Sequence, residues 1–153
     1  MTRARAEMPS LMHVGLWLSG LAGALFLVML PLAAVDAGSF SIGSEPVSGP
    51  EFLRHAGLAV GLLGALLLAV AYGFWQRRSW SRHVVMAFHL YSAGAALMLA
   101  TGAEAVAVAL QSALLFLVAG WYFYGKANVV AYFRHLRAVE AGGGRHGVPS
   151  PDA

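Results

Sequence analysis

The chain has 153 residues, of which 59% are hydrophobic and only 11% are charged, and its formal net charge is +3. Soluble domains carry about 25% charged residues, and a soluble fold of this size cannot bury so much apolar surface, so the composition excludes an ordinary soluble domain. The sequence holds no cysteine, which excludes disulfides, thiolate metal sites and cysteine nucleophiles.

Four apolar stretches take up most of the chain. They cover residues 11–35, 52–75, 84–100 and 103–124. A spanning helix needs roughly 20 residues, within a range of about 17–25, and the third stretch only just reaches that length. Lipid offers no hydrogen-bond partner to a backbone that is not helical. The sequence therefore predicts an all-α integral membrane protein in which four transmembrane helices form a bundle.

The remaining segments are short. Residues 1–10 form an N-terminus that we expect to lead into an uncleaved signal anchor, because the first apolar stretch is longer than the apolar core of a cleaved signal peptide, which has roughly 7–15 residues. Residues 36–50 are rich in Gly, Ser and Pro and form an outer loop, either as a short hairpin or as turns. Residues 126–141 predict an amphipathic helix that lies on the inner membrane surface or continues the fourth span into water. Residues 142–153 are rich in glycine and proline and are predicted to be disordered.

The basic residues indicate how the chain is oriented. Nine of the ten lie in segments that the four spans place on one side, and only Arg54 falls on the other. The positive-inside rule makes that side cytoplasmic, which predicts a multi-pass protein of the cell (inner) membrane with both termini in the cytoplasm. The same reasoning interprets the net positive charge as a topology signal and not as a sign of nucleic-acid binding. Five aromatic residues at the same interface form a predicted belt: Trp75, Trp80, Trp121, Tyr122 and Tyr124.

Small residues recur at every fourth position in three of the spans, and the row on the fourth span is Ala105, Ala109 and Ala113. The second span carries Gly57, Gly61, Ala65, Ala69 and Gly73. The first span carries Gly15, Ser19 and Gly23. In lipid, where hydrophobic drive between helices is weak, small residues allow the backbones to approach closely. These rows predict helix packing within the bundle or between copies of the chain.

A few polar side chains fall inside the spans. His89 lies seven positions past Arg82, roughly 10 Å into the membrane at about 1.5 Å per residue, and ionisable residues at such depth are functional hypotheses. His89 is either a neutral histidine hydrogen-bonded between helices or, together with His13, an axial ligand of haem b. Gln111 is expected to bond across to Ser92 or to a backbone carbonyl, with a pore lining as the alternative.

The sequence contains neither a P-loop motif nor a G-x-S-x-G nucleophile motif. It favours a non-enzymatic accessory or scaffolding subunit whose small-residue rows pack against a second copy or a larger membrane complex. One alternative is an electron-transfer protein that holds haem b between two histidines. The other is a small oligomeric channel or carrier.

Overall fold

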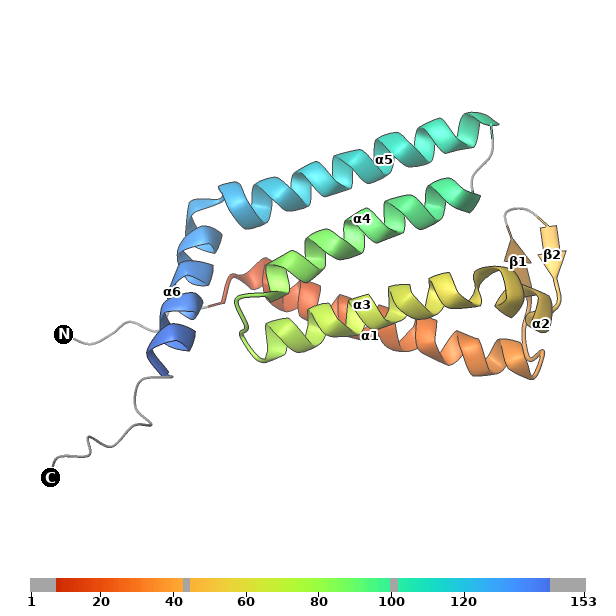
Figure 1. Ribbon diagram of the computed structural model, residues 1–153, viewed down its shortest axis with the longest axis horizontal. Coiled ribbons are helices and arrows are strands. Elements are labelled where there is room, and N and C mark those ends of the chain that lie inside the picture. The colour runs from red at the N-terminus through yellow and green to blue at the C-terminus, as the bar shows by residue number, and fades with distance from the viewer. Residues whose placement is uncertain (1–7, 43–44, 100–101, 144–153) are drawn as a thin grey trace, which may run out of the picture.

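The computed structural model describes residues 8–42, 45–99 and 102–143, and this part of the chain is predominantly helical. The long helices α1, α3, α4 and α5 run roughly along one axis, while α6 crosses them at one end and a small hairpin lies at the other (Figure 1). In chain order the elements are α1 (Ser10–Ala34), β1 (Phe40–Ile42), β2 (Glu45–Val47), α2 (Gly49–Phe52), the π-helical turn η1 (Leu53–Gly57), α3 (Leu58–Trp75), α4 (Ser81–Leu99), α5 (Gly102–Gly120), the π-helical turn η2 (Trp121–Gly125) and α6 (Ala127–Gly143).

Three helices of the described chain are long and apolar enough to cross a membrane. They are α1, the continuous helix Gly49–Trp75 that joins α2, η1 and α3, and the stretch Val106–Gly125 of α5 and η2. The predicted third span forms as α4 but is not among them, because Arg82, His89 and other polar residues lower the hydropathy of its 19 residues. The structure is therefore consistent with a membrane protein and supports three of the four predicted spans directly.

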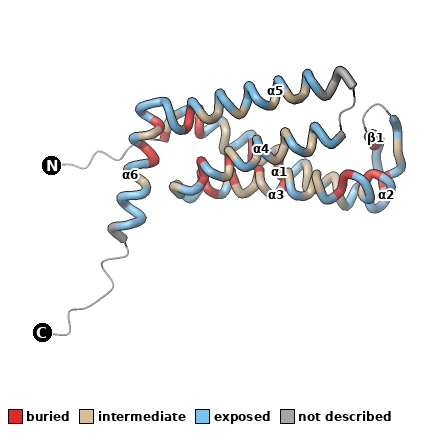
Figure 2. Tube along the Cα trace, turned by 45° about the horizontal axis from the view of Figure 1, so that its top comes forward, coloured by how far each residue is buried: buried red, intermediate tan, exposed pale blue. Residues whose placement is uncertain are grey.

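The helices pack in chain order and not as a closed bundle. α1 packs on α3, α3 on α4 and α4 on α5, whereas α1 and α5 stand at the two edges with at most sparse contact in the described chain. The expected four-helix bundle is therefore not confirmed. In the apolar stretch within Val106–Gly125, only 11% of the residues are buried, against 33% in that of the helix Gly49–Trp75 (Figure 2). Most of α5 is therefore exposed within the described chain.

Glycine brings α1 and α3 close together at one level. A Cβ atom on Gly23 would stand 3.0 Å from the carbonyl oxygen of Gly64, and a Cβ on Gly64 would stand 3.1 Å from the Leu27 side chain. Nearer the N-terminus of α1, Gly15 lies opposite Phe74 of α3. The buried Ser19 donates its hydroxyl hydrogen to the Gly15 carbonyl at 2.7 Å. The row predicted on the first span thus lies along the α1–α3 contact.

The row predicted on the second span does not face one partner. Gly61 meets α1, Gly73 meets the connection between α3 and α4, and Ala65 is exposed. The reason is geometric, because a row with a spacing of four residues drifts around a helix of 3.6 residues per turn by about 40° at each step. The other two members, Gly57 and Ala69, are buried and partly buried. Gly64, which the fourfold row omits, is the residue of α3 whose carbonyl oxygen approaches Gly23 of α1.

The outer loop takes the hairpin form. β1 and β2 pair antiparallel, with Phe40 opposite Val47. Asp36 accepts a hydrogen bond from the backbone N–H of Gly49, the first residue of α2, at 2.6 Å, and Ser48 caps the helix by accepting from the backbone N–H of Glu51. Phe40 stacks on Phe52 with ring centroids 5.3 Å apart, which fastens the hairpin to the helix. These contacts make the loop part of the folded structure.

The fourth span ends at Gly125, as the sequence indicates. Lys126 adopts an extended conformation, and α6 begins at Ala127 in a new direction. The segment predicted over residues 126–141 is therefore a separate helix and does not continue α5. Of the tail expected to be disordered over residues 142–153, positions beyond 143 lie outside the described residues.

Candidate functional site

The main cluster of buried side chains lies where α6 crosses the helix ends, and we call it the basic-end cluster. Its members come from the start of α1, the end of α3, the start of α4, η2 and α6. They are Met8, Met12, Val70, Phe74, Val85, Tyr122, Phe123, Val129, Tyr132 and Phe133. The apolar face of α6, with Val129 and Phe133 fully buried, packs on the protein itself. This contact, and not a lipid surface, covers the amphipathic face that the sequence indicates.

Arg82 enters this cluster as a buried cation. Its side chain is only 7% exposed, and its guanidinium carbon lies 5.0 Å from the ring centroid of Tyr124 and 5.5 Å from that of Phe133. The Nε atom is sealed from solvent without a hydrogen-bond partner, and no carboxylate of the described residues pairs with the side chain. Aromatic faces offset part of the cost of burying this charge.

Other polar groups lie in the basic-end cluster or against its members and Tyr124. The Tyr124 hydroxyl is hydrogen-bonded to Nδ1 of His83 at 2.8 Å, and the Lys126 ammonium lies 5.2 Å from the ring centroid of Tyr122. The hydroxyls of Tyr122 and Tyr132 are buried without a partner. The cluster therefore combines positive charge with unused hydrogen-bonding capacity.

The predicted aromatic belt divides into two groups. Trp75, Trp80 and Trp121 are exposed around the basic end, where their rings can face an interface between lipid and water. Tyr122 instead packs inside the basic-end cluster, and Tyr124 covers Arg82. Residue type alone does not distinguish an interfacial ring from one that holds α6.

A carboxylate ties the far part of α6 to the connection between α3 and α4. Glu140 accepts hydrogen bonds from both the hydroxyl and the backbone N–H of Ser79. The hydroxyl hydrogen bond of Ser79 lowers the pKa of Glu140 most, the backbone bond and the charge of Arg78 lower it further, and partial burial opposes them. The Ser79–Glu140 contact thus links the two segments electrostatically.

We expect the pKa of Glu140 to rise when Ser79 is replaced by alanine. Its folded-state pKa lies below the ordinary value of 4.5, so the contact stabilises the fold above that pH, and the stabilisation is lost as the pH falls through the lower, folded-state pKa. Because Glu140 is exposed, the contribution is under about 1 kcal/mol. Carboxyl NMR titration of wild type and Ser79→Ala measures the shift, and equal pKa values in the two proteins would contradict it.

The two histidines of the haem hypothesis are not in contact with each other in the structure. His13 is exposed on α1, and His89 is partly buried on α4, where its ring lies edge-on to Phe88 at 5.3 Å. No ring contact joins the two histidines, and α1 and α4 are not a closely packed pair within the described chain. Nor do the described residues bring three metal-ligating side chains together. The structure therefore offers no support for haem b between His13 and His89.

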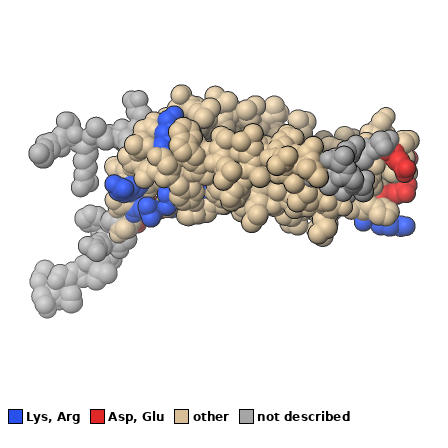
Figure 3. All heavy atoms as spheres, turned by 90° about the horizontal axis from the view of Figure 1, so that it is seen from above, with Lys and Arg blue, Asp and Glu red and all other residues tan. Residues whose placement is uncertain are grey.

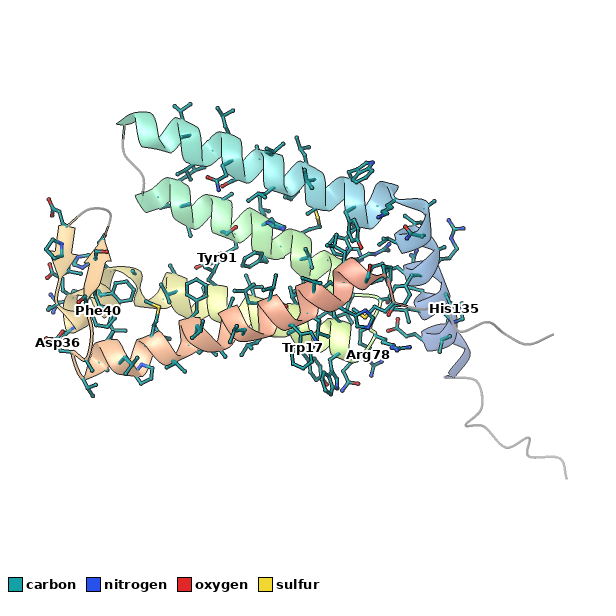
Figure 4. The ribbon with its side chains drawn as sticks, turned by 180° about the vertical axis from the view of Figure 1, so that it is seen from behind. Trp17, Asp36, Phe40, Arg78, Tyr91 and His135 are labelled. Atoms are coloured by element: carbon teal, nitrogen blue, oxygen red, sulfur yellow. The ribbon has the colours of Figure 1, made fainter. Side chains whose placement is uncertain are left out.

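The expected hydrogen bond between Gln111 and Ser92 is not formed. The Ser92 hydroxyl donates to the carbonyl of His89 in its own helix at 3.0 Å, and Gln111 is exposed on α5. The polar contact between helices comes instead from Tyr91, which points from α4 toward α3 and donates to the Ala59 carbonyl at 3.3 Å (Figure 4). A tyrosine in an apolar stretch is the only sequence signal for this bond.

No family model, curated protein or solved structure matches this chain. The function must therefore be argued from its own residues.

Proposed function

We propose that this chain is a four-span protein of the cell (inner) membrane, with both termini in the cytoplasm, that acts as a non-enzymatic accessory or scaffolding subunit. α4 is the span that its hydropathy supports least. Its 19 residues give a length of about 28 Å, close to the roughly 30 Å of a bilayer core. It also packs between α3 and α5, both of which belong to helices apolar enough to span.

The separation of charge along the long axis supports the proposed orientation. Basic side chains gather at the end where α6 lies, whereas the acidic side chains of the described residues, apart from Glu140 on α6, gather with a single basic residue at the hairpin end (Figure 3). The basic end holds Arg77, Arg78, Arg82, Lys126, Arg134 and Arg137, and the hairpin end holds Arg54, Asp36, Glu45 and Glu51. By the positive-inside rule the α6 end faces the cytoplasm.

Labelling with a membrane-impermeant thiol reagent tests this orientation. Because the chain has no cysteine, single substitutions at exposed positions report without background. Ser39→Cys, before β1, should react in intact cells, and Ala138→Cys, on α6, should react only after the membrane is opened. The reverse pattern would overturn the orientation, and equal labelling of both sites in intact cells would overturn membrane insertion as proposed.

The subunit proposal depends on the exposed position of Gln111 in the middle of α5. Gln111 lies nine residues from each end of α5, on an exposed face with Ala107, Leu114, Leu115 and Val118. Its side chain makes no hydrogen bond to any described residue. An amide without a partner in hydrocarbon costs about 2–7 kcal/mol, whereas lipid solvates the leucines beside it without cost. A helix from another chain that bonds to this amide removes that cost.

The partner helix can come from a second copy or from a larger complex. A carboxamide donates and accepts at once, so two copies of Gln111 can bond reciprocally across a twofold axis. This self-complementarity makes a second copy the simplest partner. In either case the exposed face of α5 is the contact surface.

Photo-cross-linking in the membrane tests the proposed contact. A cross-linker at position 114 on α5 should give a defined product whose mass identifies the partner, while one at exposed position 25 on α1 serves as the control. Gln111→Leu should weaken the contact about fivefold, as expected for an interhelical hydrogen bond of about 1 kcal/mol. Gln111→Asn, which keeps the amide, should retain part of the product. Cross-linking to lipid alone at position 114 would refute the subunit proposal.

A further inference from the structure

We infer that Arg82 anchors a binding site for a phosphate group at the basic end of the molecule. The ligand is the headgroup phosphate of an anionic phospholipid or a free phosphate, since both present the same oxygens to a guanidinium. The lipid form of this proposal rests on the proposed orientation, in which this end meets the cytoplasmic leaflet.

Arg82 carries a buried positive charge that no carboxylate of the described residues neutralises. A buried arginine is normally paired with a carboxylate, because an isolated buried charge is costly. Here Arg82 is only 7% exposed. The described residues around it provide aromatic faces and no carboxylate. Rings above and around a guanidinium leave its nitrogens without hydrogen-bond acceptors, so a ligand that brings acceptor oxygens completes the environment.

The guanidinium of Arg82 has one buried nitrogen and a forked end with two more. Of the three nitrogens of Arg82, only Nε is both sealed from solvent and without a partner. The two Nη nitrogens at the forked end form no hydrogen bond with the described residues, so this end has donors to offer to a ligand. A planar fork of N–H donors matches two oxygens of one phosphate, which a lysine ammonium cannot do.

The residues at the same end of the molecule add positive charge and hydrogen-bond donors. Arg82 is the second residue of α4, where the helix dipole favours an anion, although the backbone N–H groups of Ser81, His83 and Val84 already donate to carbonyl oxygens of the preceding connection. Lys126 lies against Tyr122 of the basic-end cluster, and His83 is hydrogen-bonded to Tyr124, which covers Arg82. The buried hydroxyls of Tyr122 and Tyr132 lack partners. Positive charge and unused hydroxyl donors thus occur together at this end of the molecule.

Thermal unfolding of the full chain in a neutral detergent tests the site. Added phosphatidylglycerol should raise the Tm by about 5 °C, and phosphatidylcholine, which has a phosphate but no net charge, should raise it less. An equal rise with inorganic phosphate assigns the site to free phosphate, whereas a rise with phosphatidylglycerol alone assigns it to a lipid headgroup. No rise with either anion would overturn the proposal.

Substitutions locate the effect at Arg82. Arg82→Gln should abolish the anion-dependent rise, and Arg134→Gln, which removes an exposed charge from α6 at the same end, should leave it intact. Arg82→Lys keeps the charge without the fork and should reduce the rise by at least half, which provides the test if Arg82→Gln does not fold. Equal rises in wild type and Arg82→Lys would refute bidentate binding. These outcomes are independent of the cross-linking at position 114, so the site and the subunit proposal can fail separately.

Discussion

Phe133→Ala should destabilise the protein by about 3–5 kcal/mol, the usual cost of emptying a large aromatic site in a packed core. Phe133 is fully buried, and its ring lies 5.4 Å from that of Tyr132 and 6.1 Å from that of Phe123. It is also one of the two rings that cover Arg82. Its removal therefore creates a cavity and uncovers a buried charge, and α6 should separate from the helix ends.

Two measurements check this result. Denaturant unfolding in mixed micelles gives the loss of stability, and limited proteolysis between η2 and α6 reports the detachment of α6. Val139→Ala is the matched control, because Val139 is exposed on the same helix, and it should change stability by less than about 0.5 kcal/mol. A protease-resistant Phe133→Ala protein that loses less than about 1 kcal/mol would show that α6 does not depend on this cluster.

Gly23→Leu should separate α1 from α3 and lower the stability by about 3 kcal/mol, at the upper end of the range for overpacking. Even a single Cβ at this position would meet the Gly64 carbonyl oxygen and the Leu68 side chain, each at 3.0 Å. Backbone atoms cannot rotate away as a side chain can, so the two helices must move apart. The effect should exceed that of a change on any lipid-facing position of α1.

Ala24→Leu provides the comparison for Gly23→Leu. Ala24 follows Gly23 directly but is exposed, so an added side chain there faces lipid and should be nearly neutral. Thermal unfolding in the same detergent compares the two variants with wild type. A similar Tm for both would mean that the close approach of α1 and α3 does not contribute to stability.

Some features follow directly from local sequence. The break at Gly125 follows from a glycine placed after a long apolar run, and the helix between β2 and α4 starts beside Pro50, in agreement with the preference of proline for a first helical turn. The gathering of basic groups at one end also follows from the sequence, because it depends only on which segments separate the apolar stretches. The open arrangement of the helices does not follow, since apolar length carries no information on which helices touch.

The candidate site shows where sequence reasoning reached its limit. The sequence identifies Arg82 only as one of the basic residues that indicate membrane orientation. Nothing near it in the sequence shows that Tyr124 and Phe133 enclose it. Ser92 and Gln111 looked like partners, but Ser92 bonds within its own helix. Gly64 lies outside the fourfold row and yet makes the close contact with α1. Each of these depends on how one helix is rotated against another.

The amino-acid sequence by itself determined that the described chain is helical, that three of its helices are apolar enough to cross a membrane, and which segments carry the positive charge. These properties are sums over neighbouring residues, so they can be evaluated one segment at a time. Only the tertiary structure decided that α6 covers the helix ends, that Arg82 is buried and that Gln111 faces outward. Those outcomes depend on helix rotation and crossing, which are set by the side chains of several segments packing at once.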